Sequence, residues 1–507
     1  MSPKKTARTS LPRNPCSAGP KQRPKVLLRE KLFVPSEYVK ESQLKAWTYS
    51  VPDPESEDAE DMIELQLYRN LGKVYAFCSG DVAKVQKHFG HPHFKIIDKR
   101  AAPPMSCSLN MISSLYTPET DPAEMQRNQQ QVADEWIQRG YGQIKAAARF
   151  GKTVVTTNII TRLGLKTLLL SHQWDLTTQF ERTIREHTDI NELEKLAGRK
   201  LVSRLDQWDF DKLEELDIVL STWQAWWHPS KRHYLKKYRD AFGAVFVDES
   251  HLSSPPCYSK VVNSFNTRYR VGNTATPFKL NELHVVIENI IGPVVTEGNS
   301  LQMKCSVLYV HTDVNVEKFS KWATLISRLV KDETRNDMIV EEAVSDVRNG
   351  RYILITTDRV GHAKDLVSKL NAKGVTAIAV TGETNARDSL WDKARKGEVQ
   401  VVVAMRRITR LGIDVPQWDT FYNVLPTSDP NNYYQELSRI RTFYKGKPKP
   451  IIKDFIDDPD REATGAIIGT MTARNNVYVE QGFDIENVGF VAKKPKKLAW
   501  GQRKVAT

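Results

Sequence analysis

The sequence predicts an α/β protein with two parallel-sheet units in tandem, a small domain before them and a basic segment at each end. From about residue 118, helical patterns alternate with short apolar runs at residues 166–171, 218–221 and 244–247. The same alternation returns at residues 352–357, 375–380, 399–404 and 420–424. Short apolar strands between helices are typical of a parallel sheet that is covered on both faces. Two such sheets in one chain are the simplest organisation.

Length and composition agree with this organisation. The chain has 507 residues, which corresponds to about three domains at roughly 150 residues each. Hydrophobic residues make up 40% of the chain and charged residues 27%, which excludes collagen-like, mucin-like and wholly disordered proteins. No stretch approaches the ~20 consecutive apolar residues of a membrane helix, and residues 1–20 lack the apolar core of a secretion signal. We therefore expect a soluble protein that is not secreted and has no membrane partner.

The cysteines point to a reducing compartment. There are five, an odd number; they are widely spaced, and no two form a CxxC pair. This usage argues against a disulfide framework and against a zinc site. We expect a cytoplasmic protein.

The net charge of +13 is concentrated at the two ends. Nine lysines and arginines in residues 1–31 face one acid, Glu30, and six more lie in residues 493–504. Such segments act either as solubilising tails or as a non-specific grip on nucleic-acid phosphates. The predicted parts are a basic flexible tail (1–31), an accessory domain (32–117), a first α/β unit (118–312), a second unit (313–460) and a C-terminal extension with a basic tail (461–507).

A phosphate-binding loop is predicted before the first long helix of the first unit. The segment from Ala146 to Thr153 reads AAARFGKT and runs into a helical pattern. A loop of this kind needs backbone N–H groups at a helix N-terminus, a lysine for the β- and γ-phosphates and a hydroxyl for Mg²⁺. Ala146 stands where the usual pattern has glycine, so an ordinary loop is the alternative. The candidate nucleotide-binding residues are Ala148, Arg149, Phe150, Gly151, Lys152 and Thr153.

Two adjacent carboxylates follow the apolar strand at residues 244–247. Asp248 and Glu249 would be costly at a buried strand end without a cation. We expect Asp248 and Thr153 to hold Mg²⁺, and Glu249 to polarise an attacking water. The alternative is that both acids begin a solvated loop.

The order of these motifs resembles that of superfamily 2 helicases and translocases. Lys152-Thr153 is followed by Asp248-Glu249-Ser250-His251 and by Thr274-Ala275-Thr276-Pro277. The resemblance covers about residues 118–460 and implies two RecA-like domains that use ATP and Mg²⁺. Within the superfamily the pattern is most similar to phage UvsW-type branch-migration helicases, which would place the protein in the cytoplasm of a bacterial host. The poxvirus transcript-release helicase is similar in the same places.

The resemblance also implies roles for residues outside the phosphate loop. Motif VI departs from the family pattern, because Ser438 replaces a glycine and the second arginine, Arg441, stands one place before Thr442. The implied catalytic residues of this motif are Gln435, Arg439 and Arg441, with Arg439 as the first choice for the arginine finger. The other implied contacts are Gln130 at the adenine, Gly412 and Asp414 of motif V at the nucleotide, and Thr222, Thr274, Thr276, Thr357 and Thr381 in nucleic-acid binding or coupling.

The leading hypothesis is an ATP-dependent DNA helicase or translocase that unwinds duplexes or migrates branches in replication, recombination or repair. Its expected partner is forked or branched DNA with one strand in the groove, with RNA possible, and the protein is expected to be a monomer. The alternatives are an RNA helicase or transcript-release factor, the motor subunit of a restriction system, and a nucleic-acid-binding module with a decayed ATPase.

Aromatic and basic residues interleave between Trp223 and Arg239. This combination suits stacked bases with phosphate contacts. A helix that packs its aromatic side chains into the core and turns its lysines outward has the same composition. Both interpretations stay open at this point.

Overall fold

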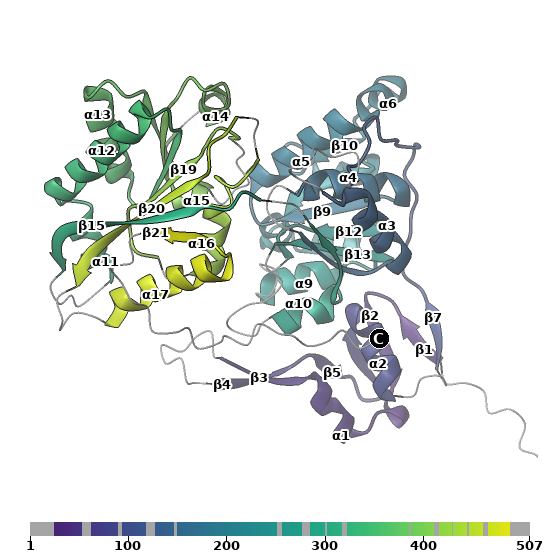
Figure 1. Cartoon of the computed structure of the whole chain (residues 1–507). Helices are drawn as coiled ribbons and strands as arrows, with labels where there is room; N and C mark the ends of the chain where they lie inside the picture. The colour runs from purple at the N-terminus through teal and green to yellow at the C-terminus, as the bar shows by residue number, and fades with distance from the viewer. Residues whose placement is uncertain are drawn as a thin grey trace, which may run out of the picture.

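The chain folds into a small N-terminal domain and two α/β units, shown in Figure 1 in purple, blue to teal, and green to yellow. The computed structural model describes residues 25–52, 62–89, 94–117, 127–146, 150–250, 256–275, 284–299, 302–316, 322–384, 387–409, 415–427, 429–443, 446–459 and 465–486.

The first α/β unit is a seven-stranded sheet in which every strand pair is parallel. The strand order is β10-β11-β9-β12-β13-β8-β14. Helices α3 to α6 contribute to the core on one face, and α7 to α10 to the core on the other. The strands are β8 (Gly142–Ala146), β9 (Thr167–Ser171), β10 (Val202–Arg204), β11 (Ile218–Thr222), β12 (Ala244–Val247), β13 (Tyr269–Thr274) and β14 (Val294–Gly298). The helices are α3 (Gln129–Arg139), α4 (Lys152–Leu163), α5 (Trp174–His187), α6 (Ile190–Ala197), α7 (Trp223–Trp227), α8 (His233–Lys237), α9 (Pro256–Ser264) and α10 (His284–Ile290).

The second α/β unit repeats this architecture. Its sheet has the order β17-β18-β16-β19-β20-β15-β21, and all its pairs are parallel. When each sheet is numbered from its own first strand, both have the order 3-4-2-5-6-1-7. The strands are β15 (Ser306–Val316), β16 (Ile353–Thr357), β17 (Ala377–Val380), β18 (Val401–Met405), β19 (Thr420–Asn423), β20 (Ile451–Pro459) and β21 (Asp484–Glu486). The helices are α11 (Trp322–Leu329), α12 (Glu333–Arg348), α13 (Val360–Ala372), α14 (Arg387–Arg395), α15 (Arg406–Thr409), α16 (Pro430–Leu437) and α17 (Gly465–Glu480).

The predicted fold class of two tandem parallel-sheet units is therefore confirmed. The boundaries differ from the predicted ones because strand pairing decides them. Strand β15 lies in the second sheet, so the second unit begins before residue 306 and not at 313. Strand β21 pairs with β15, and Tyr478 of α17 is fully buried, so residues 465–486 complete the second unit and are not an extension.

The N-terminal domain is a five-stranded mixed sheet with a two-stranded ribbon. Trp47 stacks on Phe89 and contacts Phe77 in its core. The sheet strands are β1 (Lys25–Leu28), β2 (Lys31–Pro35), β5 (Tyr68–Asn70), β6 (Val74–Cys78) and β7 (Lys95–Asp98), and the ribbon strands are β3 (Thr48–Pro52) and β4 (Met62–Gln66). Its helices are α1 (Glu41–Leu44) and α2 (Val82–Phe89).

Both predicted limits of this domain need correction. Residues 25–28 were expected in a flexible tail, but Val26 and Leu28 are buried and make β1 part of the sheet. Residues 99–117 leave the N-terminal domain and run along the first α/β unit, where Met105 and Leu109 join its core. Isolated bridges pair Ala101 with Thr267 and Pro104 with Leu165.

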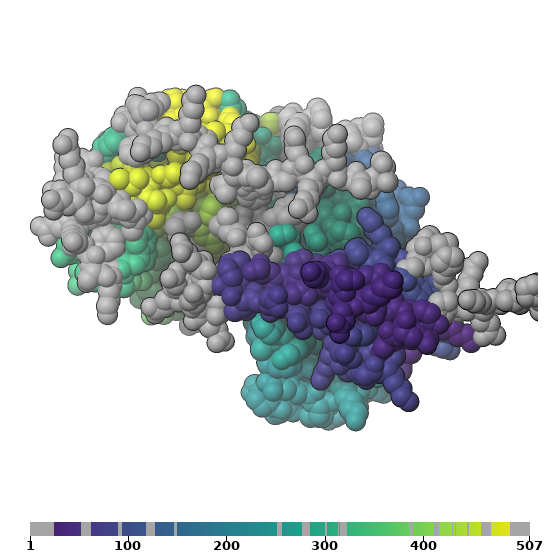
Figure 2. Space-filling view, turned by 90° about the horizontal axis from the view of Figure 1, so that it is seen from below, coloured from purple at the N-terminus to yellow at the C-terminus, as the bar shows by residue number. Residues whose placement is uncertain are grey.

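The N-terminal domain packs against the first unit. A Cβ atom on Gly80 would lie 2.6 Å from the carbonyl oxygen of Asn289, at the end of α10, so only glycine fits there. The buried Arg270 of β13 donates hydrogen bonds to the carbonyl oxygens of Glu30 and Ile290. Figure 2, seen from below, shows the purple N-terminal residues lying across the teal part of the first unit.

No helix in the described part of the chain is long and apolar enough to span a membrane.

The connection between the two units is fixed on both sides. The amide of Asn299 donates to Asn128 Oδ1 of the first unit at 2.7 Å. Met303 lies against the second unit, since its amide donates to the carbonyl oxygen of Arg441 at 2.9 Å and its own carbonyl accepts from Arg441 Nε at 3.2 Å. Residues 300–302 separate these two anchors.

Arg335 anchors α12 in the second unit. It is fully buried, its Nε atom lies 2.6 Å from Asp457 Oδ1 of β20, and it also donates to the carbonyl oxygen of Val424. Arg335 therefore connects α12 to the carboxyl ends of β19 and β20.

Replacing Arg335 with alanine is expected to destabilise the second unit by about 3–5 kcal/mol, because Asp457 would stay buried without its guanidinium. Urea unfolding followed by circular dichroism measures the loss. Lys373→Ala is the control, because Lys373 pairs with Glu341 at the surface, where a pair contributes about 1 kcal/mol or less. Equal small losses in both variants would contradict the assignment.

Candidate nucleotide and nucleic-acid site

The predicted site residues of the first unit gather at one edge of its sheet. Strands β8, β9, β11, β12 and β13 are parallel, so their carboxyl ends meet at this edge. Ala146 ends β8, Thr222 ends β11, Asp248 follows β12 and Thr274 ends β13. Ligands of open parallel sheets bind at this edge, because the loops that follow the strands converge there.

The phosphate loop joins β8 to α4. Gly151 precedes the helix with φ at +90°, a left-handed conformation that favours glycine. Lys152 and Thr153 form the first turn of α4, where backbone N–H groups and the helix dipole attract anions. The Nζ atom of Lys152 lies 3.3 Å from the carbonyl oxygen of Ala146 and 3.4 Å from Glu249 Oε1. The lysine thus links the end of β8 to Glu249.

Gln129 contacts the phosphate loop, whereas its neighbour Gln130, predicted to contact the adenine, does not. The buried Gln129 side chain donates to the carbonyl oxygen of Phe150 at 2.6 Å and accepts from the amide of Tyr116 at 3.1 Å. Gln130 instead donates to Asp134 one turn along α3. One residue corresponds to about 100° around a helix, so the two neighbours point in different directions. The run of three glutamines at 129–131 hid this register in the sequence.

Asp248 and Glu249 lie directly after β12. Asp248 is 7% exposed, and burial together with the Glu249 carboxylate raises its pKa to about 7, while Lys152 acts in the opposite direction. Glu249 has a φ of +46°, a strained value for a residue other than glycine. That turn brings the Glu249 carboxylate to Lys152. Crowded carboxylates with a raised pKa suit a site that binds a cation.

Strand β13 connects Thr274 to the phosphate helix. Asn273 Nδ2 donates to Thr156 Oγ1 of α4 at 2.7 Å, in a buried contact. Ser250, two residues after Asp248, donates to Gln143 Oε1 at 2.8 Å, and Gln143 donates to the carbonyl oxygen of Gly292. Thr274 itself is fully buried. Strand β13, which ends at Thr274, is therefore hydrogen-bonded to helix α4. The loop that carries Asp248 and Glu249 is hydrogen-bonded to β8 through Ser250 and Gln143.

In the second unit, Gln435 lies on α16 and both candidate arginines follow it. Arg439 is 5% exposed. Arg441 is engaged elsewhere, because its Nη1 atom donates to Gln481 Oε1 at 3.0 Å and its guanidinium lies over the ring of Phe483 at 4.8 Å. Together with its contacts to Met303, these interactions make Arg441 a clamp on the inter-unit connection.

A buried hub beneath motif VI was missed from the sequence. Arg406, the first residue of α15, lies 3.6 Å from the Glu436 carboxylate and donates to Asn423 Oδ1 at 2.8 Å. Thr356 also donates to Glu436. The hub ties the ends of β16, β18 and β19 to α16. A buried arginine directly after the apolar β18 was the signal that could have revealed it, because buried guanidinium groups need partners.

The nucleic-acid threonines are buried at the ends of strands. Thr222, Thr357 and Thr381 are 3%, 0% and 2% exposed. The Thr357 hydroxyl shares a 3.0 Å hydrogen bond with His362 Nδ1, and His362 Nε2 bonds with Asn336. Burial lowers the pKa of His362 to about 3, so this imidazole is neutral. The predicted residues Ala148, Arg149, Thr276, Gly412 and Asp414 lie outside the described residues.

The aromatic and basic segment splits into two parts. Trp226, Tyr234 and Tyr238 are buried in the core, as the packing alternative predicted. Trp223 and Trp227 are half-buried, and the cationic groups of Arg232 and Lys260 lie over the Trp227 ring.

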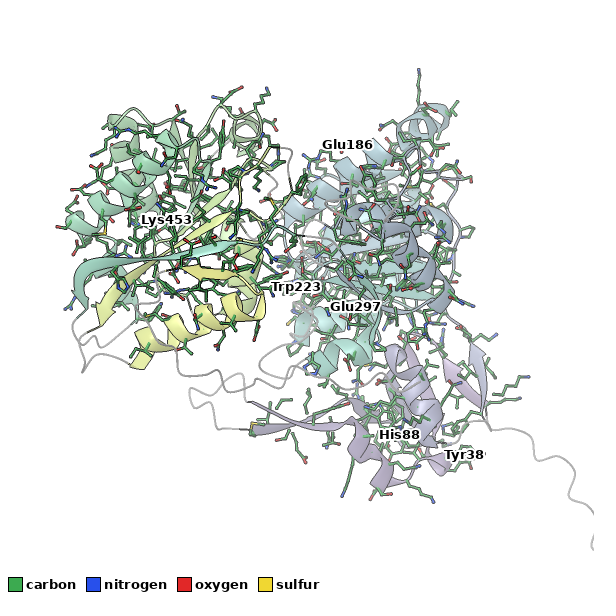
Figure 3. All side chains as sticks on the ribbon, viewed as in Figure 1. Tyr38, His88, Glu186, Trp223, Glu297 and Lys453 are labelled. Atoms are coloured by element: carbon green, nitrogen blue, oxygen red, sulfur yellow. The ribbon has the colours of Figure 1, made fainter. Side chains whose placement is uncertain are left out.

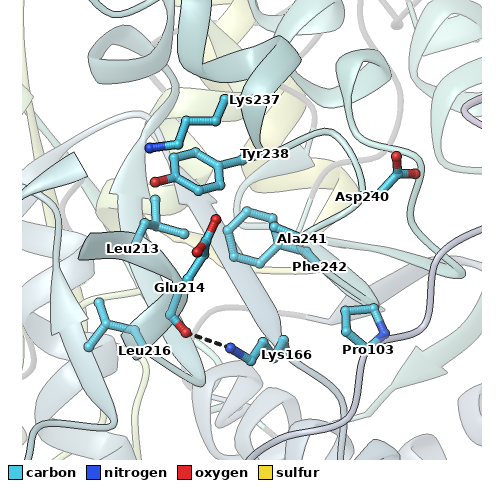
Figure 4. A pocket seen from close by; sticks show the side chains of 10 residues that line it. All are labelled: Pro103, Lys166, Leu213, Glu214, Leu216, Lys237, Tyr238, Asp240, Ala241 and Phe242. Atoms are coloured by element: carbon cyan, nitrogen blue, oxygen red, sulfur yellow. Dashed lines mark hydrogen bonds between the residues drawn. The ribbon is translucent and has the colours of Figure 1, made fainter. Parts of the chain in front are cut away.

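A cavity of about 280 Å³ lies at the opposite edge of the same sheet (Figure 4). Its lining includes Lys166, Leu216 and Phe242, which precede β9, β11 and β12. The Lys166 ammonium group donates to the carbonyl oxygen of Glu214 at 2.7 Å. This cavity is therefore separate from the phosphate loop.

The glutamine pair provides a direct test of the phosphate-loop geometry. Gln129→Ala is expected to weaken nucleotide binding about tenfold, because the loop loses a buried hydrogen bond and gains a void. Gln130→Ala is the matched control and should bind like the parent. Titration of a fluorescent ATP analogue measures both. Stronger loss in Gln130→Ala would instead support the predicted contact of Gln130 with the adenine.

Comparison with known protein families agrees with this geometry. Residues 123–279 match the family model "Type III restriction enzyme, res subunit", and residues 334–442 match "Helicase conserved C-terminal domain". The first match spans β8 to β13, and the second extends from α12 through Arg441.

Several curated proteins are similar at low identity. The DNA 3'-5' helicase XPB of Mycobacterium tuberculosis is 21% identical over 367 residues, which cover 69% of this chain and 61% of that protein. The DNA 3'-5' translocase XPB2 of Sulfurisphaera tokodaii is 25% identical over 381 residues, with 65% and 82% covered. A protein of Acanthamoeba polyphaga mimivirus, named for an ATP-dependent RNA helicase, is 21% identical over 426 residues, with 79% and 76% covered.

A solved helicase structure supports the fold. A variant of S. cerevisiae Dbp5 bound to RNA and ADP BeF3 aligns with a TM-score of 0.50 at 15% identity, covering 71% of this chain and 88% of that one. T4 UvsW aligns with a TM-score of 0.37 at 14% identity over 91% of this chain and 98% of its own, and a UvsW-type role stays a prediction. With both helicase family matches placed on two sheets of identical strand order, the chain belongs to superfamily 2 of the helicases.

Proposed function

We propose that this protein is an ATP-dependent DNA helicase or translocase. The observation that carries the proposal is the position of Lys152 between the carbonyl oxygen of Ala146 and the carboxylate of Glu249. A cation held between a phosphate loop and an acidic strand end is the arrangement that nucleoside triphosphate hydrolysis requires. DNA is favoured because two similar proteins are named for a DNA 3'-5' helicase and a DNA 3'-5' translocase.

The residues of the first unit fit a Mg²⁺–triphosphate. Asp248 and Thr153 offer the hard oxygen donors that Mg²⁺ prefers, and the first turn of α4 offers N–H groups to the phosphates. When bound, Mg²⁺ neutralises charge on the phosphate oxygens. Lys152 binds the β- and γ-phosphates, and Glu249 orients and deprotonates the attacking water. Gln129 holds the loop in register through the carbonyl oxygen of Phe150.

The second unit supplies the remaining groups in this proposal. Arg439 supplies positive charge that stabilises the negative charge of the transition state. Gln435 lies on α16, four residues before Arg439. Gly412 and Asp414 of motif V complete the nucleotide side. The Arg406–Glu436 pair holds α16 against the strand ends, so it positions Arg439 without contacting the nucleotide.

Nucleic acid follows the loops at the same sheet edges. The buried Thr222, Thr357 and Thr381 contribute through the backbone that they fix, because their side chains lie inside the fold. Backbone contacts of this kind follow phosphates and do not read the base sequence. Thr274 and Thr276 couple the two activities.

RNA is the second candidate substrate, favoured by the mimivirus relative named for an ATP-dependent RNA helicase. The discriminating experiment is Mg²⁺-dependent ATP hydrolysis measured with no nucleic acid, single-stranded DNA, forked DNA and RNA. Stimulation by forked DNA above the other substrates supports the branch-migration role in recombination or repair. Stimulation by RNA alone would replace DNA by RNA in the proposal.

Lys152→Ala and Glu249→Gln are each expected to abolish nearly all ATP turnover. Their ATP affinities should differ, because Lys152 contacts phosphate directly whereas Glu249 acts on water. Equilibrium binding should therefore weaken strongly in Lys152→Ala and stay close to the parent in Glu249→Gln. Near-normal turnover in either variant would refute the site.

Arg439→Ala is expected to lower kcat for ATP by roughly 10³-fold or more, with a much smaller effect on ATP binding, because its charge acts mainly in the transition state. Arg441→Ala is the comparison. Since Arg441 clamps Met303 and Gln481, its loss should lower the melting temperature more than Arg439→Ala does. A severe loss of kcat in Arg441→Ala with a mild one in Arg439→Ala would exchange the two roles.

A further inference from the structure

The surface part of the aromatic and basic segment forms a stack of side chains on and after α7, the helix that follows Thr222. The guanidinium carbon of Arg232 lies 4.0 Å from the centre of the Trp227 ring, and Arg232 Nε donates to the carbonyl oxygen of Trp227 at 2.7 Å. The ring contact and the hydrogen bond together hold the guanidinium on the indole. The ammonium group of Lys260, from α9, lies 5.7 Å from the same ring.

This stack presents a flat cation to solvent. Arg232 and Lys260 are exposed, whereas Trp227 is half-buried and packs against the core beneath it. A guanidinium group has two faces, and one of them lies on Trp227. Because Arg232 is exposed, its guanidinium can be reached from solvent by a second planar group. Guanidinium planes on aromatic rings are surfaces on which unpaired bases stack.

The stack lies next to the motif loops of the first unit. Helix α7 carries Trp227 and begins directly after Thr222, at the carboxyl end of β11. Gln224 of α7 donates to the carbonyl oxygen of His172, which follows β9. Helix α7, which carries Trp227, is therefore joined to the segments that follow β9 and β11.

The base of α7 is also connected to the metal-binding carboxylate. Trp223 stacks on Tyr258 with ring centres 5.5 Å apart and planes 18° apart. The Tyr258 hydroxyl donates to the carbonyl oxygen of Leu170, which also accepts from the amide of Asp248 at 2.9 Å. Figure 3 shows Trp223 on the side of the first unit that faces the second unit. A strand running along that side would reach α7.

We propose that Arg232 and Trp227 form a base-stacking platform for single-stranded nucleic acid, with Lys260 contacting a neighbouring phosphate. The proposal rests on the proposed function and adds to it a contact with a base. The occupant is a nucleic acid strand because it combines planar bases with the negative charge that Arg232 and Lys260 complement. A stack of this kind favours strands whose bases are unpaired.

The test compares a thymidine 20-mer with a 20-mer of the same backbone that lacks bases. Fluorescence anisotropy in the presence of a non-hydrolysable ATP analogue gives the affinity of the full chain for each strand. Trp227→Ala and Arg232→Ala should weaken binding of the thymidine strand about tenfold. Because no base is present, Trp227→Ala should change binding of the abasic strand less than twofold. Arg232→Lys, which keeps the charge and loses the plane, should behave like Trp227→Ala.

Two controls separate stacking from charge and from folding. Lys236→Ala removes an exposed cation of α8 and should weaken binding of both strands equally. Trp208→Ala removes a half-buried tryptophan of the same core and should leave binding of both strands unchanged. Melting temperatures of all variants identify any that fail to fold.

In Trp227→Ala, equal losses on both strands, or no loss on either, would overturn the platform. If the parent chain binds neither strand and nucleic acid does not stimulate its ATP hydrolysis, the proposed function itself fails. If the parent binds both strands with equal affinity, a base contact is excluded while the helicase proposal stands.

Discussion

The ion pair between Lys152 and Glu249 joins the two strand ends on which the site depends. The backbone is left-handed at or next to both partners: Lys152 follows Gly151, for which a positive φ costs little, whereas Glu249 itself has a positive φ and is strained. Both are held because β8 and β12 lie in one parallel sheet whose core is buried on both faces. The strain is thus supported by the packing of the whole unit, as is usual where backbone geometry serves chemistry.

The sequence predicted the parts of the fold and site that depend on short local patterns. Apolar runs revealed the central strands. The GKT and DESH segments placed Lys152 at a helix start and Asp248 and Glu249 after a strand end, where the structure has them, and their catalytic roles stay predictions. The pairing of strands that lie far apart in the chain could not be predicted from such local patterns. Nothing local to residues 484–486 shows that they would pair with β15 and complete the second sheet.

The side-chain partners of individual residues could not be predicted for a similar reason. In a run of three glutamines, only the start of α3 decides that Gln129 meets the phosphate loop while Gln130 turns to Asp134. Arg406 and Glu436 are 30 residues apart and look like ordinary charges until the ends of three strands bring them together. Arg441 matched a family position closely enough to be a candidate, yet the fold uses it to hold Met303.

The contacts of Arg441 with Met303 fix one end of the short connection between the two units, so this connection is a pivot. Asn299 is tied to the first unit and Met303 to the second, so the chain between them reaches at most about 14 Å when fully extended. The two units can rotate about this point but cannot drift apart while both anchors hold. The anchors also neighbour candidate site residues: Asn128 adjoins Gln129, and Arg441 lies two residues from Arg439. The same short connection is therefore held beside Gln129 in one unit and beside Arg439 in the other.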